Sequence, residues 1–391
     1  MIKKSSIAQL LFLMASCYII APWFFEKRFL FNELLAASGF CLLAYHRFKV
    51  SKDSISYHIM FLLGWCVVHI ITSLFRADNA YYYLRNLVIV YSIFCYFLGF
   101  FLLPYLRVYL QKARVPLKYY IGLFLLIPLP RLFFERFGVS ALFPALLRKI
   151  PDKLLLPLMI GLNIIYAISY KSFTTFVLAA FYILLLVSPG YKFFKQFAFL
   201  LFACFVVFFI LIKPNLDIIA LHYDYYDTIA IHEVMNSNVL LSIDGNSTWR
   251  LVLWKEVIVD NFPSNIFGVG FGTPMIKYFP VEDFSKIPSL PYVIGAHNSF
   301  VYLFGRLGII YLLVIAIIYR KIFKEYFYYK SIYYQNKKIL VFWSFFAISI
   351  IALFNPVLES PIFSGAYWLI LGLLARCIQI RIKETKPAFS A

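Results

Sequence analysis

One histidine and three cationic side chains stand out in an apolar chain, at His297, Arg250, Arg306 and Lys171. Arg250 and His297 lie in a polar interval, residues 213–298, that holds nine of the 18 acids and three of the six histidines. A neutral imidazole can accept a proton near neutral pH, and Arg and Lys neutralise phosphate oxygens. These residue types predict a site where a phosphate-bearing substrate binds beside a general base.

Arg306 follows His297 by nine residues, which places it about 13 Å further along a helix. A charged side chain inside a membrane costs roughly 2.5–3.5 kcal/mol on insertion scales, so it tends to face a cavity or an anion. We therefore expect Arg306 to contact an anion. Two alternatives stay open, a snorkelling Arg306 and a His297 that only anchors the chain at the membrane interface.

The composition indicates a membrane protein, since 63% of the 391 residues are hydrophobic and 20% are aromatic. Repeated apolar runs of roughly 20 residues match the thickness of a bilayer core. We expect an all-α polytopic membrane protein with about 10–12 transmembrane helices and one long extracytoplasmic loop that contains an amphipathic helix. The net charge of +19 fits basic cytoplasmic loops, so nucleic acid is not an expected partner.

The basic residues also predict the sidedness of the chain. Residues 107–118 carry four Lys and Arg with no acid, and residues 320–338 carry six with one acid, so both intervals should be cytoplasmic. Whether residues 119–147 cross the membrane stays open. The predicted division is an N-terminal transmembrane bundle (1–212), an extracytoplasmic catalytic loop (213–297), and C-terminal transmembrane helices with a basic cytoplasmic tail (298–391).

Two local patterns lie within the loop. Residues 249–261 have the spacing of an amphipathic helix suited to the membrane–water interface, and Pro263 should end it. Gly268, Gly270 and Gly272 predict a tight turn whose backbone approaches a neighbour closely, because no strand precedes them as a dinucleotide site requires. The six cysteines fall in apolar stretches, and we expect neither a metal nor a cofactor.

Across about residues 245–312, the order and spacing of several residues resembles the O-antigen ligase and O-antigen polymerase superfamily. The residues that carry the resemblance are Arg250, Trp254, Pro263, Gly268, Gly270, Gly272, His297, Asn298 and Gly308. The resemblance implies a multi-pass glycosyltransferase of the bacterial inner membrane whose catalytic loop faces the periplasm. It also implies a glycan on undecaprenyl pyrophosphate as donor and a sugar hydroxyl as acceptor, on a glycan or on lipid A-core.

By this resemblance, His297 would deprotonate the acceptor and Arg250 would hold the pyrophosphate. The family often has a second phosphate-binding Arg where this chain has Lys171, and an acid where it has Arg306. A lysine keeps the charge but loses the planar fork of the guanidinium, and we keep Lys171 and Arg306 as predicted pyrophosphate contacts.

Three functions stay open from the sequence. The first is a polymerase that joins lipid-linked repeat units of a surface polysaccharide. The second is a ligase that transfers the finished chain to lipid A-core. The third, from another class, is a flippase for lipid-linked glycans, which would share the helices and cationic residues without needing a histidine at the end of a long loop. A chain-length regulator stays open as a partner beside the lipid bilayer.

Overall fold

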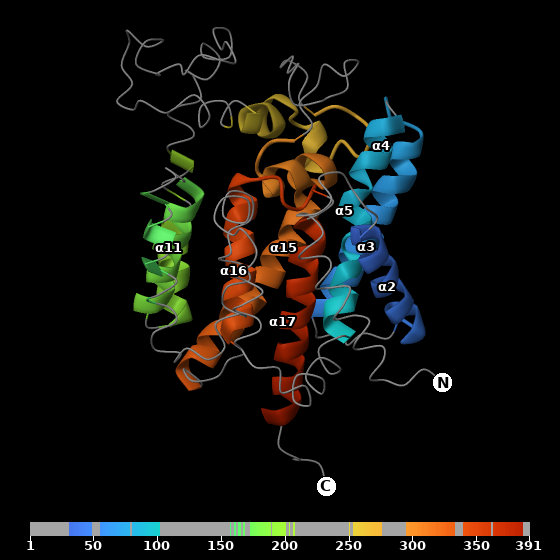
Figure 1. The fold of residues 1–391 in the computed structure, drawn as a ribbon. Helices are drawn as coiled ribbons and strands as arrows, with labels where there is room; N and C mark the ends of the chain where they lie inside the picture. The colour runs from blue at the N-terminus through green and yellow to red at the C-terminus, as the bar shows by residue number, and fades with distance from the viewer. Residues whose placement is uncertain are drawn as a thin grey trace, which may run out of the picture. The chain divides into compact units, whose positions relative to one another are not determined.

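The computed structural model describes nine main stretches of the chain and a few shorter pieces between residues 157 and 207. The main stretches are residues 31–48, 55–78, 80–101, 173–188, 190–200, 250 with 253–275, 295–332, 339–360 and 363–385. Within them the regular elements are helices (Figure 1). The elements are α2 (Phe31–Tyr45), α3 (Ile55–Leu74), α4 (Ala80–Asn86), α5 (Val88–Tyr91), α11 (Phe173–Val187), η2 (Glu256–Asp260), η3 (Ser264–Ile266), α15 (Ser299–Ile332), α16 (Ile339–Phe354) and α17 (Phe363–Thr385).

Four helical stretches among these residues are long and apolar enough to cross a membrane: Ile55–Leu74, Ala80–Phe101, Ser299–Tyr328 and Phe363–Ile380. Large apolar side chains on α3, such as Phe61 and Ile71, are about half exposed, as expected where a helix faces lipid tails. The expectation of a helical membrane protein is therefore confirmed in this coarse form. The count of 10–12 helices depends also on residues outside the described stretches and stays a prediction.

The chain divides into two compact units by packing rather than by chain order. The first comprises Met1–Cys66, Asn86–Val187 and Ala316–Ala391, and the second comprises Val67–Arg85 and Ser188–Ile315. The second unit groups the described residues of the predicted catalytic loop with the end of α3 and the start of α15.

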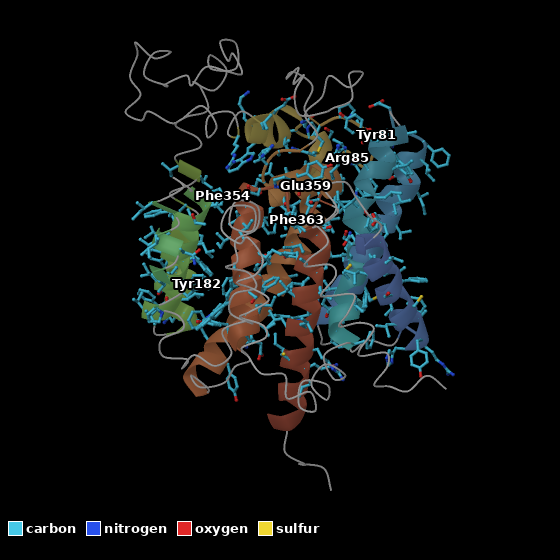
Figure 2. The ribbon with its side chains drawn as sticks, viewed as in Figure 1. Tyr81, Arg85, Tyr182, Phe354, Glu359 and Phe363 are labelled. Carbon is cyan, nitrogen blue, oxygen red and sulfur yellow. The ribbon has the colours of Figure 1, made fainter. Side chains whose placement is uncertain are left out.

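Close helix packing builds the first unit, in which α16 lies beside both α17 and α11 (Figure 1). A Cβ on Gly99 or Gly372 would overlap a backbone carbonyl of the neighbouring helix, Leu369 or Tyr96 respectively. Small residues permit such approach where lipid supplies no hydrophobic driving force between helices. Tyr182 of α11, labelled in Figure 2, donates its hydroxyl to the carbonyl of Trp343 in α16 at 3.3 Å.

A chain of buried polar side chains ties three segments of this unit together. Asn32 Nδ2 at the start of α2 donates to Ser92 Oγ at 2.8 Å, just after α5. Ser92 Oγ and Ser364 Oγ, the latter in α17, share a hydrogen bond at 2.7 Å. All three residues are at most 3% exposed. Because no water competes inside a membrane, such bonds connect helices that apolar contacts alone would leave free to slide.

Candidate functional site

Every contact of the candidate site lies within the second unit, and its framework is an interruption of α15. Gly308 has φ 74° and ψ −173°, which is outside the helical region although helix continues on both sides. A Cβ at this position would overlap the backbone of Ile266 and Phe267, so only glycine allows that segment to reach α15. The interruption therefore lets the loop before α15 pack against the helix backbone itself.

Residues 268–273, which we call the glycine loop, fill this interruption. The N–H groups of Val269 and Gly270 donate to the carbonyls of Gly305 and Arg306, at 2.8 and 3.0 Å. A regular helix would bond those carbonyls to residues four positions further on, beyond Gly308. The loop thus supplies the donors that the interruption removes, as buried carbonyls require in a membrane. The predicted close approach of the glycine backbone is confirmed.

Arg306 binds the same loop with its side chain. Its Nη1 donates to the carbonyl of Gly270 at 3.0 Å and also to the carbonyl of Thr273. Its guanidinium lies 5.3 Å from the ring centroid of Tyr302, within the range of a cation–π contact. Arg306 is only 2% exposed. Its observed contacts are therefore protein groups, and the anion contact expected from the sequence stays a prediction.

The end of α3 holds the other side of the glycine loop. The N–H of Phe271 donates to Ser73 Oγ at 2.8 Å, and Gly272 lies so close to Ala77 that an added Cβ would come within 2.6 Å of its methyl group. Thr273 Oγ1 donates to the carbonyl of Arg76 at 3.4 Å. The loop is therefore fixed between α15 and the end of α3, whose Ser73 lies 198 positions before Phe271 in the chain.

The predicted amphipathic helix over 249–261 is corrected in its second half. Residues 253–255 are α-helical, but Glu256–Asp260 form the π-helical turn η2. Asn265 Nδ2 donates to the carbonyls of Val257 and Ile258 at 2.6 and 3.0 Å, and Asn261 Nδ2 donates to that of Glu256 at 2.8 Å. These side chains satisfy the carbonyls of Glu256, Val257 and Ile258 at the end of the helix, where the wider turn alters the regular bonding pattern.

This helix is also more buried than an interfacial helix would be. Leu253 and Val257 are fully buried, and Trp254 is 7% exposed. Gly305 of α15 lies against it, since a Cβ there would come within 2.8 Å of the Val257 side chain. Spacing alone predicted an apolar side facing the membrane surface, whereas that side packs on the protein.

His297 lies between two fixed neighbours. The indole Nε1 of Trp254 donates to the carbonyl of Ala296 at 2.7 Å. On the other side Asn298 caps α15, because its Oδ1 accepts the N–H groups of Phe300 and Val301 at 3.0 and 3.1 Å. His297 itself has φ 49°, which few residues other than glycine adopt. Backbone strain of this kind collects at functional sites, where the surroundings hold it in place.

Arg250 lies close enough to His297 to alter its protonation. Burial first, and then the positive charge of Arg250, lower the pKa of His297 from 6.5 to about 4. His297 is therefore neutral at pH 7 and has a lone pair available to accept a proton. The structure thus brings together the two residues from which the sequence predicted a base beside a phosphate-binding group.

The other predicted residues have different outcomes. Arg306 lies in the same unit but engages the glycine loop, and Lys171 lies outside the described residues. The sequence did not predict the hydrogen bond from Trp254 to Ala296 or the contacts of Ser73 and Asn265. For Trp254, its spacing of four residues from Arg250 was the available indication. The described residues contain no group of three or more His, Cys, Asp or Glu side chains that could hold a metal ion.

Comparisons with known protein families, with curated proteins and with solved structures find no match to this chain.

Proposed function

We propose that this chain is a membrane glycosyltransferase that uses a glycan on undecaprenyl pyrophosphate as donor and a sugar hydroxyl as acceptor. The observation that carries the proposal is a neutral, positioned His297 beside the guanidinium of Arg250, in a unit that includes parts of helices long and apolar enough to cross a membrane. The residue order that resembles the O-antigen ligase and polymerase superfamily supplies the substrate class.

In the proposed reaction His297 takes the proton of the acceptor hydroxyl as that oxygen attacks the anomeric carbon of the donor sugar. One carbon–oxygen bond forms there as the bond to the pyrophosphate oxygen breaks. The leaving undecaprenyl pyrophosphate keeps the electron pair, and Arg250 neutralises the charge that develops on it. The proton on His297 then passes to solvent, so the residues end as they began.

The low pKa of His297 in the free protein fits a reaction in which the donor binds before the acceptor is deprotonated. Arg250 opposes protonation of His297 while its own charge is uncompensated. A pyrophosphate bound at Arg250 would offset that charge and raise the pKa of His297 towards the range where general bases are most effective. Donor binding would therefore prepare the base that activates the acceptor.

We assign polymerase as the first activity and ligase as the alternative, since the two share this chemistry and differ in acceptor. The proposed location is the bacterial inner membrane, with the site facing the periplasm, where the sidedness of basic residues puts the 213–297 loop. A flippase is the alternative function from another class of protein. A flippase would not need a positioned base beside Arg250.

The test uses the full-length protein in lipid nanodiscs with a purified repeat unit on undecaprenyl pyrophosphate. We expect a ladder of longer lipid-linked glycans. His297→Ala should lower turnover by about 10²–10⁴-fold, the usual contribution of a general base. Arg250→Lys should also be strongly impaired, since the charge stays and the bidentate geometry is lost.

His46→Ala is the matched control, because His46 stacks on Phe101 in the first unit with ring centroids 4.1 Å apart. It should turn over like wild type. Transfer only onto added lipid A-core would identify the ligase. Full turnover by His297→Ala, or movement of donor between leaflets of a vesicle with no new glycosidic bond, would refute the transferase.

A further inference from the structure

The contacts of Arg306 are those of a residue with a structural role. Its Nη1 is engaged by the carbonyls of Gly270 and Thr273, and its guanidinium stacks near Tyr302. With 2% of its surface exposed, it has little surface left to meet a substrate. Arginine is suited to this task because several N–H groups in one plane bind more than one carbonyl while the charge stays delocalised.

The glycine loop that Arg306 holds is joined to the helical segment 253–260, which follows Arg250 in the chain. Three residues before the loop, Asn265 binds the carbonyls of Val257 and Ile258. Two residues after it, the carbonyl of Met275 accepts from Asn261 Nδ2 at 2.8 Å. Residues that flank the loop on both sides are thus bonded to the end of this helical segment, so a shift of the segment would also move the loop.

The same helix fixes the backbone at His297. Trp254 lies four positions after Arg250 and binds the carbonyl of Ala296 at 2.7 Å. Hydrogen bonds joined by short stretches of backbone therefore connect Arg306, through the glycine loop and this helical segment, to the residue before His297. Each bond in this set lies within the second unit.

We propose that Arg306 is a positioning residue for the His297–Arg250 pair, acting through the glycine loop and not by touching the substrate. The inference rests on the proposed function, because it concerns the geometry of that transferase site. It gives the arginine inside α15 a role different from the anion contact expected from its sequence position. It also explains why the loop is held from both α3 and α15.

The experiment measures two properties of Arg306→Met in the full-length protein in nanodiscs. The first is kcat and KM with the lipid-linked repeat unit. We expect kcat to fall by about 10²-fold, the effect of a shift near 1 Å in a catalytic group, with KM for the donor unchanged. The second is the pKa of His297 from the pH dependence of deuterium exchange at its imidazole C2–H. It should rise from about 4 towards 6.5, because a loosened site admits water.

Arg306→Lys should restore part of kcat, since an ammonium group also donates to carbonyl oxygens. Arg376→Met is the matched control: Arg376 lies in α17 of the first unit with its guanidinium 5.2 Å from the Phe100 ring centroid. That variant should leave both kcat and the His297 pKa at wild-type values.

Ser73→Ala provides a milder probe if Arg306→Met fails to fold, because it removes only the bond from Phe271 N–H. A smaller rise in the His297 pKa is expected, and an unchanged value would overturn the inference. A raised KM for donor with an unchanged His297 pKa in Arg306→Met would instead establish an anion contact. Because the exchange measurement needs no turnover, it tests the inference even if wild type proves to transfer no sugar.

Discussion

The indole Nε1 of Trp254 donates to the carbonyl of Ala296 at 2.7 Å, which ties the helical segment that follows Arg250 to the residue directly before His297. The two are 42 positions apart in the chain. Trp254 is 7% exposed and Ala296 is fully buried, so water does not replace this bond. This side-chain donor therefore helps to set the position of the proposed base relative to the proposed phosphate-binding group.

Trp254→Phe tests this dependence. Phenylalanine keeps most of the apolar contact but leaves the Ala296 carbonyl without its donor, at a cost of about 1–3 kcal/mol. We expect a large loss of turnover with only a small drop in the unfolding temperature, because the backbone at His297 is no longer held in place. Trp343→Phe is the control, since Trp343 Nε1 also donates a buried bond, to Tyr326 at 3.4 Å in the first unit. Equal losses of turnover in both variants would contradict the prediction.

Arg250→Gln should raise the pKa of His297. The pKa is lowered first by burial and then by Arg250, so removing the cation makes protonation easier, while burial keeps the value below 6.5. In wild type, the acidic limb of kcat/KM should therefore lie near pH 4, and in Arg250→Gln at higher pH. Exchange at the His297 C2–H reports the same shift without turnover. A limb that stays in place would show that Arg250 does not act on His297.

Gly308→Ala should disrupt the junction of α15 with the glycine loop. A φ of 74° costs an ordinary residue about 1–2 kcal/mol, and the added methyl also overlaps the backbone of Ile266 and Phe267. The free energy of unfolding, measured in detergent, should fall by more than this conformational cost alone. Gly64→Ala in α3 is the control, because no atom lies within 4 Å of its Cβ position; it should gain up to about 1 kcal/mol. An unchanged free energy of unfolding in Gly308→Ala would mean that the junction is not fixed.

Ser92→Ala should weaken the first unit without affecting the site chemistry. It removes the shared partner of Asn32 and Ser364, and interhelical bonds in membranes average about 0.6 kcal/mol each. The free energy of unfolding should fall by about twice that amount with kcat unchanged. Ser38→Ala is the control, since its hydroxyl binds only the carbonyl of Leu34 within α2. A loss of the same size at Ser38 would refute a bridging role for Ser92.

Much of the site was visible in the sequence because its residues carry chemistry that their types reveal. Arg250 and His297 could be paired because an arginine can bind phosphate and a neutral histidine can accept a proton. The glycines at 268, 270 and 272 predicted a close backbone approach, and the structure confirms it. The partner of this loop on α3 could not be predicted, because the Ser73 hydroxyl, which accepts from the N–H of Phe271, lies 198 positions before it in an apolar helix with no distinguishing pattern.

The helical, membrane-spanning character of this protein was determined by the sequence alone, since the length of an apolar run and the burial of backbone groups in lipid are local properties. The tertiary structure decided the rest. It gave Arg306 carbonyl partners, turned 256–260 into a π-helical turn and interrupted α15 at Gly308. Each of these depends on which distant group satisfies a buried donor or acceptor. Hydropathy and spacing carry no information on such pairing, because it forms only when the segments pack.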